Sequence, residues 1–216
     1  MYVPQHFAET DNAVLHALIR AHPLGTWVTA GDDGLVANHI PFLIDPARGE
    51  RGTLIAHVAR ANPIWRTFST AVPSLVVFQG AQAYITPSWY PSKKAHGKAV
   101  PTWNYVVVHA HGTPRAIEDR AWLRKHLEAL VSVHEAPQAV PWKIADAPAD
   151  FIDGLLRVIV GIEIPIATLT GKWKVSQNRP EPDKLGVVAG LCAHGDASST
   201  AMAELVRQHI PSNAEG

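Results

Sequence analysis

Strand patterns that do not alternate with helices constrain the fold of this 216-residue chain more than any other feature. Runs rich in β-branched and aromatic residues predict six or seven strands, at 24–30, 35–44, 53–58, 74–80, 82–86, 102–115 and 158–169. A doubly wound parallel sheet would need a helix after nearly every strand. The pattern therefore favours an α+β chain, in which a mostly antiparallel β-barrel carries peripheral and C-terminal helices.

Helix signals occupy a few separate segments. Asn62 can cap a short helix with Pro63 at its first position, and Asp119 can cap a longer one. The segment 87–101 is rich in Pro, Lys and Gly and is predicted to be a loop, whereas the tail predicts one or two helices. Because there is no internal repeat or clear linker, we expect one barrel domain with a C-terminal helical extension, over 1–180 and 181–216.

Acidic residues are missing from one long stretch of the chain. The whole chain has 19 Lys and Arg against 19 Asp and Glu, yet positions 51–117 hold seven Lys and Arg and no acid. The same stretch holds three tryptophans and three tyrosines. A second acid-free run, 164–180, carries Lys172, Lys174 and Arg179. Cations and aromatic rings without acids suit a ligand that joins a flat ring to a phosphate.

Composition excludes several classes of protein. A net charge of zero argues against a nucleic-acid binder that is basic over its whole length. One cysteine, Cys192, excludes an intramolecular disulfide and a cysteine-based zinc cluster. The start lacks the basic and apolar regions of a signal peptide, and the longest uncharged run, 67–92, contains three prolines and a glycine. We therefore expect a cytoplasmic protein without membrane contacts.

Seven ordered sequence blocks resemble the PaiB-type family, negative transcriptional regulators with an FMN-binding split-barrel fold. The blocks are MYVPQHF (1–7), HPLGTWVT (22–29), ANHIPFLI (37–44), HVARANPIW (57–65), VVFQGAQAYITPSWYPSK (76–93), VPTWNYVVVHAHG (100–112) and GKWKVSQNR (171–179). The resemblance implies a split β-barrel, a homodimer and flavin mononucleotide at the dimer interface. Within these blocks Asn38, His39 and His57 are candidate cofactor-binding residues.

The phosphate end of such a cofactor needs donors and positive charge. The run HVARANP offers Arg60, the Asn62 side chain and the amino end of a short helix. Lys93, in the predicted loop, is a further cation that can close over the same anion.

The ring end needs a flat slot and hydrogen-bonding groups. Gln79 can meet the polar edge of the ring, and further candidates for stacking and hydrogen bonding are Ser88, Trp89, Thr102, Trp103 and Asn104. On a strand, Trp103 and Tyr105 share one face and Thr102 and Asn104 share the other, so only one set lines the ligand. Barrel core is the alternative interpretation of Trp103 and Tyr105.

The last block is unusually polar for a turn that follows a strand. By the family resemblance, we expect it to reach the flavin site of its own or the partner subunit, through Lys172, Ser176, Gln177, Asn178 and Arg179. The alternative is a hydrogen-bonded corner that holds the C-terminal helices.

These residues leave three functions open. The first is an FMN-binding protein that can act as a flavin-dependent oxidoreductase, for which no catalytic acid or base can be named. The second is a transcriptional regulator that binds DNA directly, for which 120–130 is the best basic helix. The third is a haem-binding relative, with His39, His57, His109 and His111 as candidate ligands. No metal site is expected, because the acid-free stretch lacks a supporting carboxylate.

Overall fold

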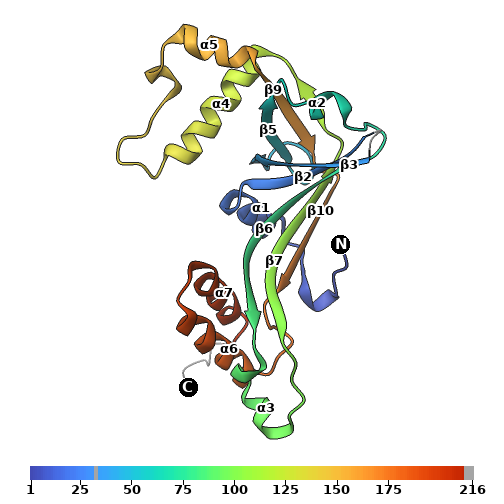
Figure 1. The fold of residues 1–216 in the computed structure, drawn as a ribbon, viewed down its shortest axis with the longest axis vertical. Coiled ribbons are helices and arrows are strands. Elements are labelled where there is room, and N and C mark those ends of the chain that lie inside the picture. Colours follow the sequence, from blue (N-terminus) through green and yellow to red (C-terminus); the bar gives the residue numbers. More distant parts are fainter. Residues whose placement is uncertain (32–33, 212–216) are drawn as a thin grey trace. The chain divides into compact units, whose positions relative to one another are not determined.

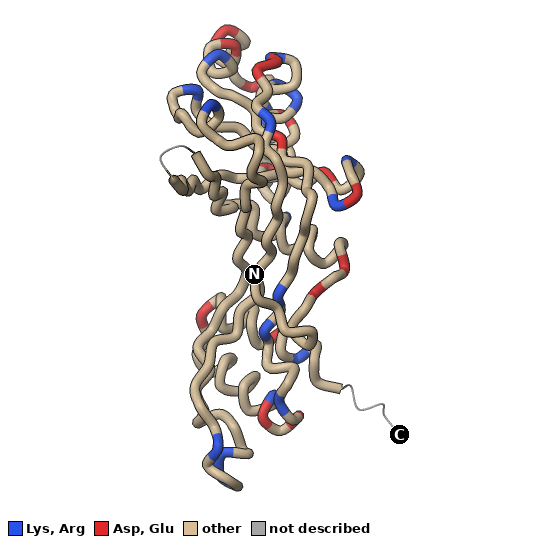
Figure 2. Tube along the Cα trace, turned by 90° about the vertical axis from the view of Figure 1, so that its right-hand side faces the viewer, with Lys and Arg blue, Asp and Glu red and all other residues tan. Residues whose placement is uncertain are grey.

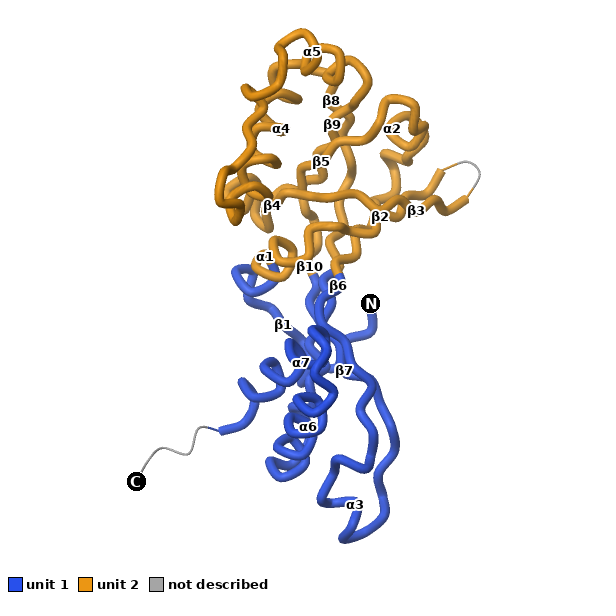
Figure 3. The backbone as a smooth tube through the Cα atoms, turned by 60° about the vertical axis from the view of Figure 1, so that its left-hand side comes forward, with its two compact units in different colours: residues 1–15, 79–108, 170–216 blue, residues 16–78, 109–169 orange. Residues whose placement is uncertain are grey.

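The computed structural model describes residues 1–31 and 34–211. The chain divides into two compact units (Figure 3), each built from separate stretches of sequence. Unit 1 contains Met1–Leu15, Gln79–Val108 and Thr170–Gly216, and unit 2 contains His16–Phe78 and His109–Leu169. The expected boundary at residue 180 stays a prediction, and the C-terminal segment lies in unit 1.

Two antiparallel sheets form the β-structure (Figure 1). The larger has the order β1-β10-β7-β6-β2-β3, with bounds Ala8–Glu9, Thr168–Lys174, Thr102–Gly112, Ser74–Ile85, Leu24–Gly31 and Gly34–Pro41. The smaller has the order β4-β5-β9-β8, with bounds Leu43–Asp45, Thr53–Ala59, Ile159–Pro165 and Arg115–Ile117. Antiparallel sheets with flanking helices confirm the predicted α+β class.

Several predicted strand boundaries were wrong, and proline and glycine explain most of them. The predicted strand 158–169 breaks after Pro165 into β9 and β10, because proline cannot donate a ladder hydrogen bond. Pro114 likewise separates β7 from β8 within the predicted strand 102–115. Conversely, the predicted strands 74–80 and 82–86 form one strand, β6. Its exposed positions change phase between Gln79 and Gln82, as at a β-bulge.

The described helices are α1 to α7, with bounds Asn12–Ala21, Ile64–Thr67, Pro91–His96, Arg120–Glu135, Ala149–Arg157, Glu181–His194 and Ala197–Arg207. Asp119 caps α4 as predicted, accepting a hydrogen bond of 2.7 Å from the Trp122 amide. The predicted loop 87–101 was wrong in part, because α3 lies within it. Pro91 starts this helix, and Gly97 ends it with a φ of +69°.

Each unit has its own buried side chains. In unit 2, Leu123 of α4 packs with Ile144, Ile152 and Leu156. In unit 1, α6 lies so close to Trp89 that a side chain at Gly186 or Gly190 would overlap it. These two glycines therefore allow the close approach. Within the described residues, no helix is long and apolar enough to cross a membrane.

Candidate functional site

The residues expected to bind a cofactor fall into two groups. Unit 2 contains Asn38, His39, His57, Arg60 and Asn62. Unit 1 contains Gln79, Ser88, Trp89, Lys93, Thr102, Trp103, Asn104, Lys172, Ser176, Gln177, Asn178 and Arg179. The structure brings together parts of each group, which are described within their own unit.

Arg60 in unit 2 binds other parts of the protein. Its guanidinium pairs with Glu118 and donates to the carbonyl oxygens of Arg157 at 2.9 Å and Ile159 at 3.2 Å. A phosphate at Arg60 would compete with these three partners.

Asn62 joins the start of α2 to strand β3. Its Nδ2 donates to Asn38 Oδ1 at 2.7 Å, and its Oδ1 accepts from the Ile64 amide at 3.1 Å. Asn62 therefore bonds the first amide of α2 as expected, but the N-cap position is Pro63, which was predicted to be the first residue of the helix. Helix α2 has only four residues, so its dipole is short. His39, near the C-terminal end of β3, is exposed.

His57 faces helix α4. Its Nδ1 lies 3.0 Å from His126 Nε2, and the His126 ring stacks on Trp122. Burial lowers the pKa of His57, and burial together with His57 lowers the pKa of His126 to about 4. Sequence analysis missed His126, because a histidine inside an amphipathic helix gives no signal of a partner 69 positions away.

Three cations of unit 1 lie beside aromatic rings and main-chain oxygens. Lys174 Nζ donates to Thr102 Oγ1 and to the Trp103 carbonyl oxygen. Lys172 Nζ donates to the Tyr2 carbonyl oxygen at 3.1 Å and lies 5.3 Å from the centre of the Tyr105 ring. We call Lys172, Lys174 and Arg179 the cation cluster.

No carboxylate forms an ion pair with the cation cluster in the described part of the chain. Arg179 instead lies 4.7 Å above the Tyr90 ring. Burial lowers the pKa of Lys174, and Lys172 and Arg179 lower it further. Residues 51–117 and 164–180 contain no Asp or Glu. The acidic residues that are drawn red in Figure 2 therefore all belong to other parts of the sequence. The cluster is therefore positively charged and without a counter-ion from these residues.

An aromatic pair lies on the open side of β6 and β7. Trp103 and Tyr84 are 53% and 50% exposed, and their rings meet edge to face at 6.0 Å. The alternative that Trp103 is barrel core was wrong, because Asn104 takes the buried side of β7. Its amide donates to Ser176 Oγ at 2.9 Å, which makes burial of this polar side chain possible.

The polar run after β10 has a divided role. Ser176 adopts a left-handed φ of +63° and receives the bond from Asn104. Gln177 bonds its own turn, accepting from the Val175 amide at 2.8 Å and donating to the Trp173 carbonyl oxygen. These two residues form the hydrogen-bonded corner of the alternative interpretation, whereas Asn178 is exposed.

The remaining unit 1 candidates differ in accessibility. Trp89 packs against α6, with its ring edge to face with His194. Its contacts therefore stabilise the fold of unit 1. Gln79, Ser88 and Lys93 are exposed.

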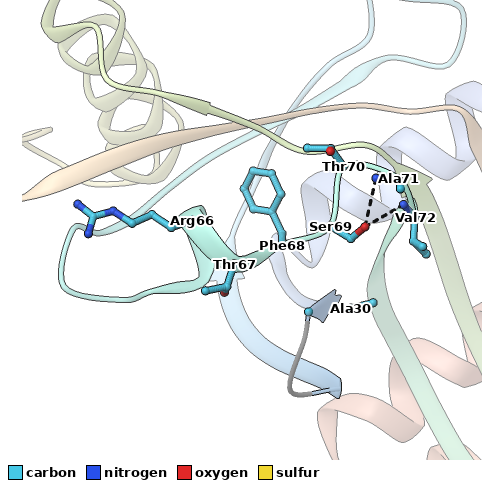
Figure 4. A pocket seen from close by; sticks show the side chains of 9 residues that line it. Ala30, Arg66, Thr67, Phe68, Ser69, Thr70, Ala71 and Val72 are labelled. Carbon is cyan, nitrogen blue, oxygen red and sulfur yellow. Dashed lines mark hydrogen bonds between the residues drawn. The ribbon is translucent and has the colours of Figure 1, made fainter.

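Unit 2 also contains a polar pocket that the sequence did not indicate (Figure 4). Its volume is about 600 Å³, and it is lined by Ala30, Gly31 and residues 66–72. Ser69 Oγ accepts from the amides of Ala71 and Val72, both at 3.1 Å. Arg66 points away from this turn and lies 4.2 Å from the Trp65 ring, so the pocket contains hydroxyl groups without a converging cation.

Comparisons with known proteins identify what the chain is similar to. A family model described as "Putative FMN-binding domain" matches residues 1–168. "Protease synthase and sporulation protein PAI 2" of Bacillus subtilis (strain 168) is 30% identical over 210 residues, which covers 97% of this chain and 98% of that protein.

Solved structures share the fold. The flavocytochrome Anf3 from Azotobacter vinelandii superposes with a TM-score of 0.60 at 13% identity, over 80% of this chain and 72% of that one. The FAD and haem binding protein from Mycobacterium smegmatis gives 0.56 at 19% identity, over 77% and 73%. The fold is therefore the split β-barrel that the sequence predicted.

Proposed function

We propose how this chain, which belongs to the family of FMN-binding domains, holds its flavin. Membership of the family makes FMN the cofactor. In our proposal the cation cluster binds the phosphate, and the exposed faces of Trp103 and Tyr84 provide the surface for the isoalloxazine ring. When bound, the flavin supplies hydride and electron transfer.

One observation carries this proposal: the cation cluster has no carboxylate partner in the described residues. Burial, and after it the neighbouring charges of Lys172 and Arg179, disfavours the charged form of Lys174 and lowers its pKa. A phosphate monoester carries about −1.5 to −2 charges at pH 7, and would neutralise the cluster. The nearby aromatic pair gives the flat apolar surface that the other end of FMN requires.

Competing positions for the phosphate have weaker support. Arg60 has a carboxylate partner, and the pocket of Figure 4 lacks a converging cation. Direct DNA binding through α4 also lacks support. Arg120 and Arg124 both pair with Asp153, at 3.5 and 3.0 Å, which neutralises part of that basic surface.

We further propose that two copies of the chain form a homodimer with the flavin at its interface. The last strand in the order of the larger sheet, β3, exposes Leu35 and Val36 by 78% and 45%. Apolar side chains on an edge strand favour coverage by another chain. Light scattering should give about twice the chain mass of 23.4 kDa. A monomeric mass with flavin bound would contradict this part of the proposal.

The test of the phosphate assignment compares FMN with riboflavin, which lacks the phosphate. We expect the wild-type chain to bind FMN at least tenfold more tightly, measured by titration calorimetry. In Lys174→Met the preference should shrink, because one of the three cations is lost. Equal affinities of the wild type for FMN and riboflavin would contradict phosphate binding by the cluster.

A further inference from the structure

We propose that a second pocket, in unit 2, binds a small amphipathic amine, with an apolar body and a protonated amino group. The pocket has a volume of about 740 Å³, within the range of small-molecule sites. It is lined by α4 and by strands β4, β5, β8 and β9. None of the residues proposed to bind the flavin lines it, so this proposal is independent of the proposed function.

The walls of the pocket are suited to an apolar body. Aliphatic side chains from both the sheet and the helix face it, together with the Trp122 ring: Leu43, Ile44, Ile55, Ile117 and Ala129. A hydrocarbon or aromatic group bound there would be removed from water, which is favourable.

A buried carboxylate supplies the specific polar contact. Glu163 is 6% exposed, and its Oε1 accepts from Arg48 at 2.6 Å and from Trp122 Nε1 at 3.0 Å. Its Oε2 has no hydrogen-bond donor among residues 1–31 and 34–211. This oxygen is not among the unpaired side-chain atoms that are sealed from solvent, and Glu163 is one of the residues that line the pocket. An ammonium group donates to such an oxygen with a charge-assisted bond.

The bond from Arg48 lowers the pKa of Glu163, so this carboxyl is ionised at neutral pH. Asp45, half-buried at the end of β4, adds a second carboxylate to the lining. No Lys or Arg forms an ion pair with Asp45 in the described chain.

The cations of the pocket are less available than its acids. Arg48 already forms an ion pair with Glu163. Lys125 is exposed, so its flexible head can extend into water. The acids with unused oxygen atoms therefore favour a cationic ligand over a carboxylate.

His126 also lines the pocket, but its unpaired ring nitrogen is sealed from solvent. Nδ1 of His126, a residue 5% exposed, has no hydrogen bond in the described residues, because the ring bonds His57 through Nε2. A ligand in the pocket therefore meets the Glu163 carboxylate, and Oε2 of Glu163 is the unused polar atom that carries the proposal.

The test uses the full-length protein and three probes of similar shape: 2-phenylethylamine, 2-phenylethanol and 3-phenylpropionate. Ligand-observed NMR titrations would measure their affinities at pH 7.5. We expect the amine to bind at least tenfold more tightly than the alcohol, and the carboxylate to bind most weakly. Tighter binding of the carboxylate, or equal affinities for amine and alcohol, would overturn the proposal.

Variants locate the site. Glu163→Gln keeps the size of the side chain and should weaken amine binding at least tenfold. Because Glu163 also holds Arg48 and Trp122, Ala129→Phe on the exposed side of α4 serves as a second variant that fills the pocket. Glu128→Gln, an exposed neighbour outside the lining, is the matched control and should bind as the wild type does. Unchanged amine affinity in Ala129→Phe would place the probe elsewhere and contradict the proposal.

Discussion

His57 Nδ1 and His126 Nε2 lie 3.0 Å apart, so one neutral imidazole donates a hydrogen bond to the other and neither ring needs a charge. The contact joins strand β5 to helix α4 within unit 2. Burial lowers the pKa of both rings, that of His126 to about 4. The pair therefore makes the stability of the chain depend on pH.

The expected pH dependence follows from the sign of these shifts. Below an ordinary histidine pKa of about 6.5, the two histidines bind protons in the unfolded chain but stay neutral in the folded one. The free energy of unfolding therefore falls as the pH decreases. For His126 the loss should amount to about 3 kcal/mol between pH 7.5 and pH 4. Urea unfolding at several pH values would measure it. In His126→Phe, which retains a ring against Trp122, this part of the loss should disappear, and an unchanged pH profile would contradict the account.

Gly190 should be intolerant of a side chain. In Gly190→Ala the new methyl group would overlap the Trp89 ring, so α6 or Trp89 must shift, at a cost of about 1–3 kcal/mol of unfolding free energy. Gly154→Ala in α5 is the matched control, since nothing lies within 4 Å of its new methyl group. That variant should be about 0.5–1 kcal/mol more stable than the wild type, because alanine favours helix. Equal effects of the two substitutions in urea denaturation would show that Trp89 does not pack as described.

The Asn104–Ser176 bond should stabilise the fold. Both residues are buried, at 1% and 4% exposure, so either single alanine variant leaves a buried polar group unpaired and costs about 1–3 kcal/mol. The double variant should cost less than the sum of the two, because neither group is then left without its partner. Unfolding free energies of all four proteins would give the coupling, and strict additivity would contradict a direct bond.

Sequence patterns predicted the strands and most helix positions, because burial alternates along a strand and caps have a local signature. Asp119 is an example, since its carboxylate lies beside the amide it caps. Predicted strand boundaries were wrong where a residue such as glycine is compatible both with a strand and with a break between strands. The break predicted between strands 74–80 and 82–86, next to Gly80, lies inside the continuous β6.

Such local patterns do not predict contacts between residues that lie far apart in the sequence. The alternation along β7 separates Trp103 from Asn104 but does not say which side is buried. From side-chain polarity alone, Trp103 would be expected on the buried side. Asn104 is buried instead, because its amide bonds Ser176, which lies 72 positions away in the sequence. For the same reason, the ion pair of Arg60 with Glu118 could not be foreseen when Arg60 was considered for the phosphate.

Trp103 should serve binding more than folding. Because the side chain is 53% exposed, Trp103→Ala should change the unfolding free energy by less than about 1 kcal/mol. Loss of a stacking surface should weaken FMN binding about tenfold, which corresponds to about 1.4 kcal/mol. Fluorescence titration with FMN and urea unfolding of the same variant separate the two effects. A large loss of unfolding free energy with intact flavin binding would indicate that Trp103 stabilises the core and does not bind the flavin.

In the proposed site, the cation cluster holds the flavin phosphate. The most direct test is an FMN titration, followed by visible absorption, of the wild type, Lys174→Met/Arg179→Met and the matched exposed pair Lys143→Met/Arg20→Met. We expect shifted flavin bands in the wild type and the matched control, and an FMN affinity at least tenfold lower in the cluster variant. Equal affinity in all three proteins, or loss of FMN on Arg60→Ala instead, would contradict it.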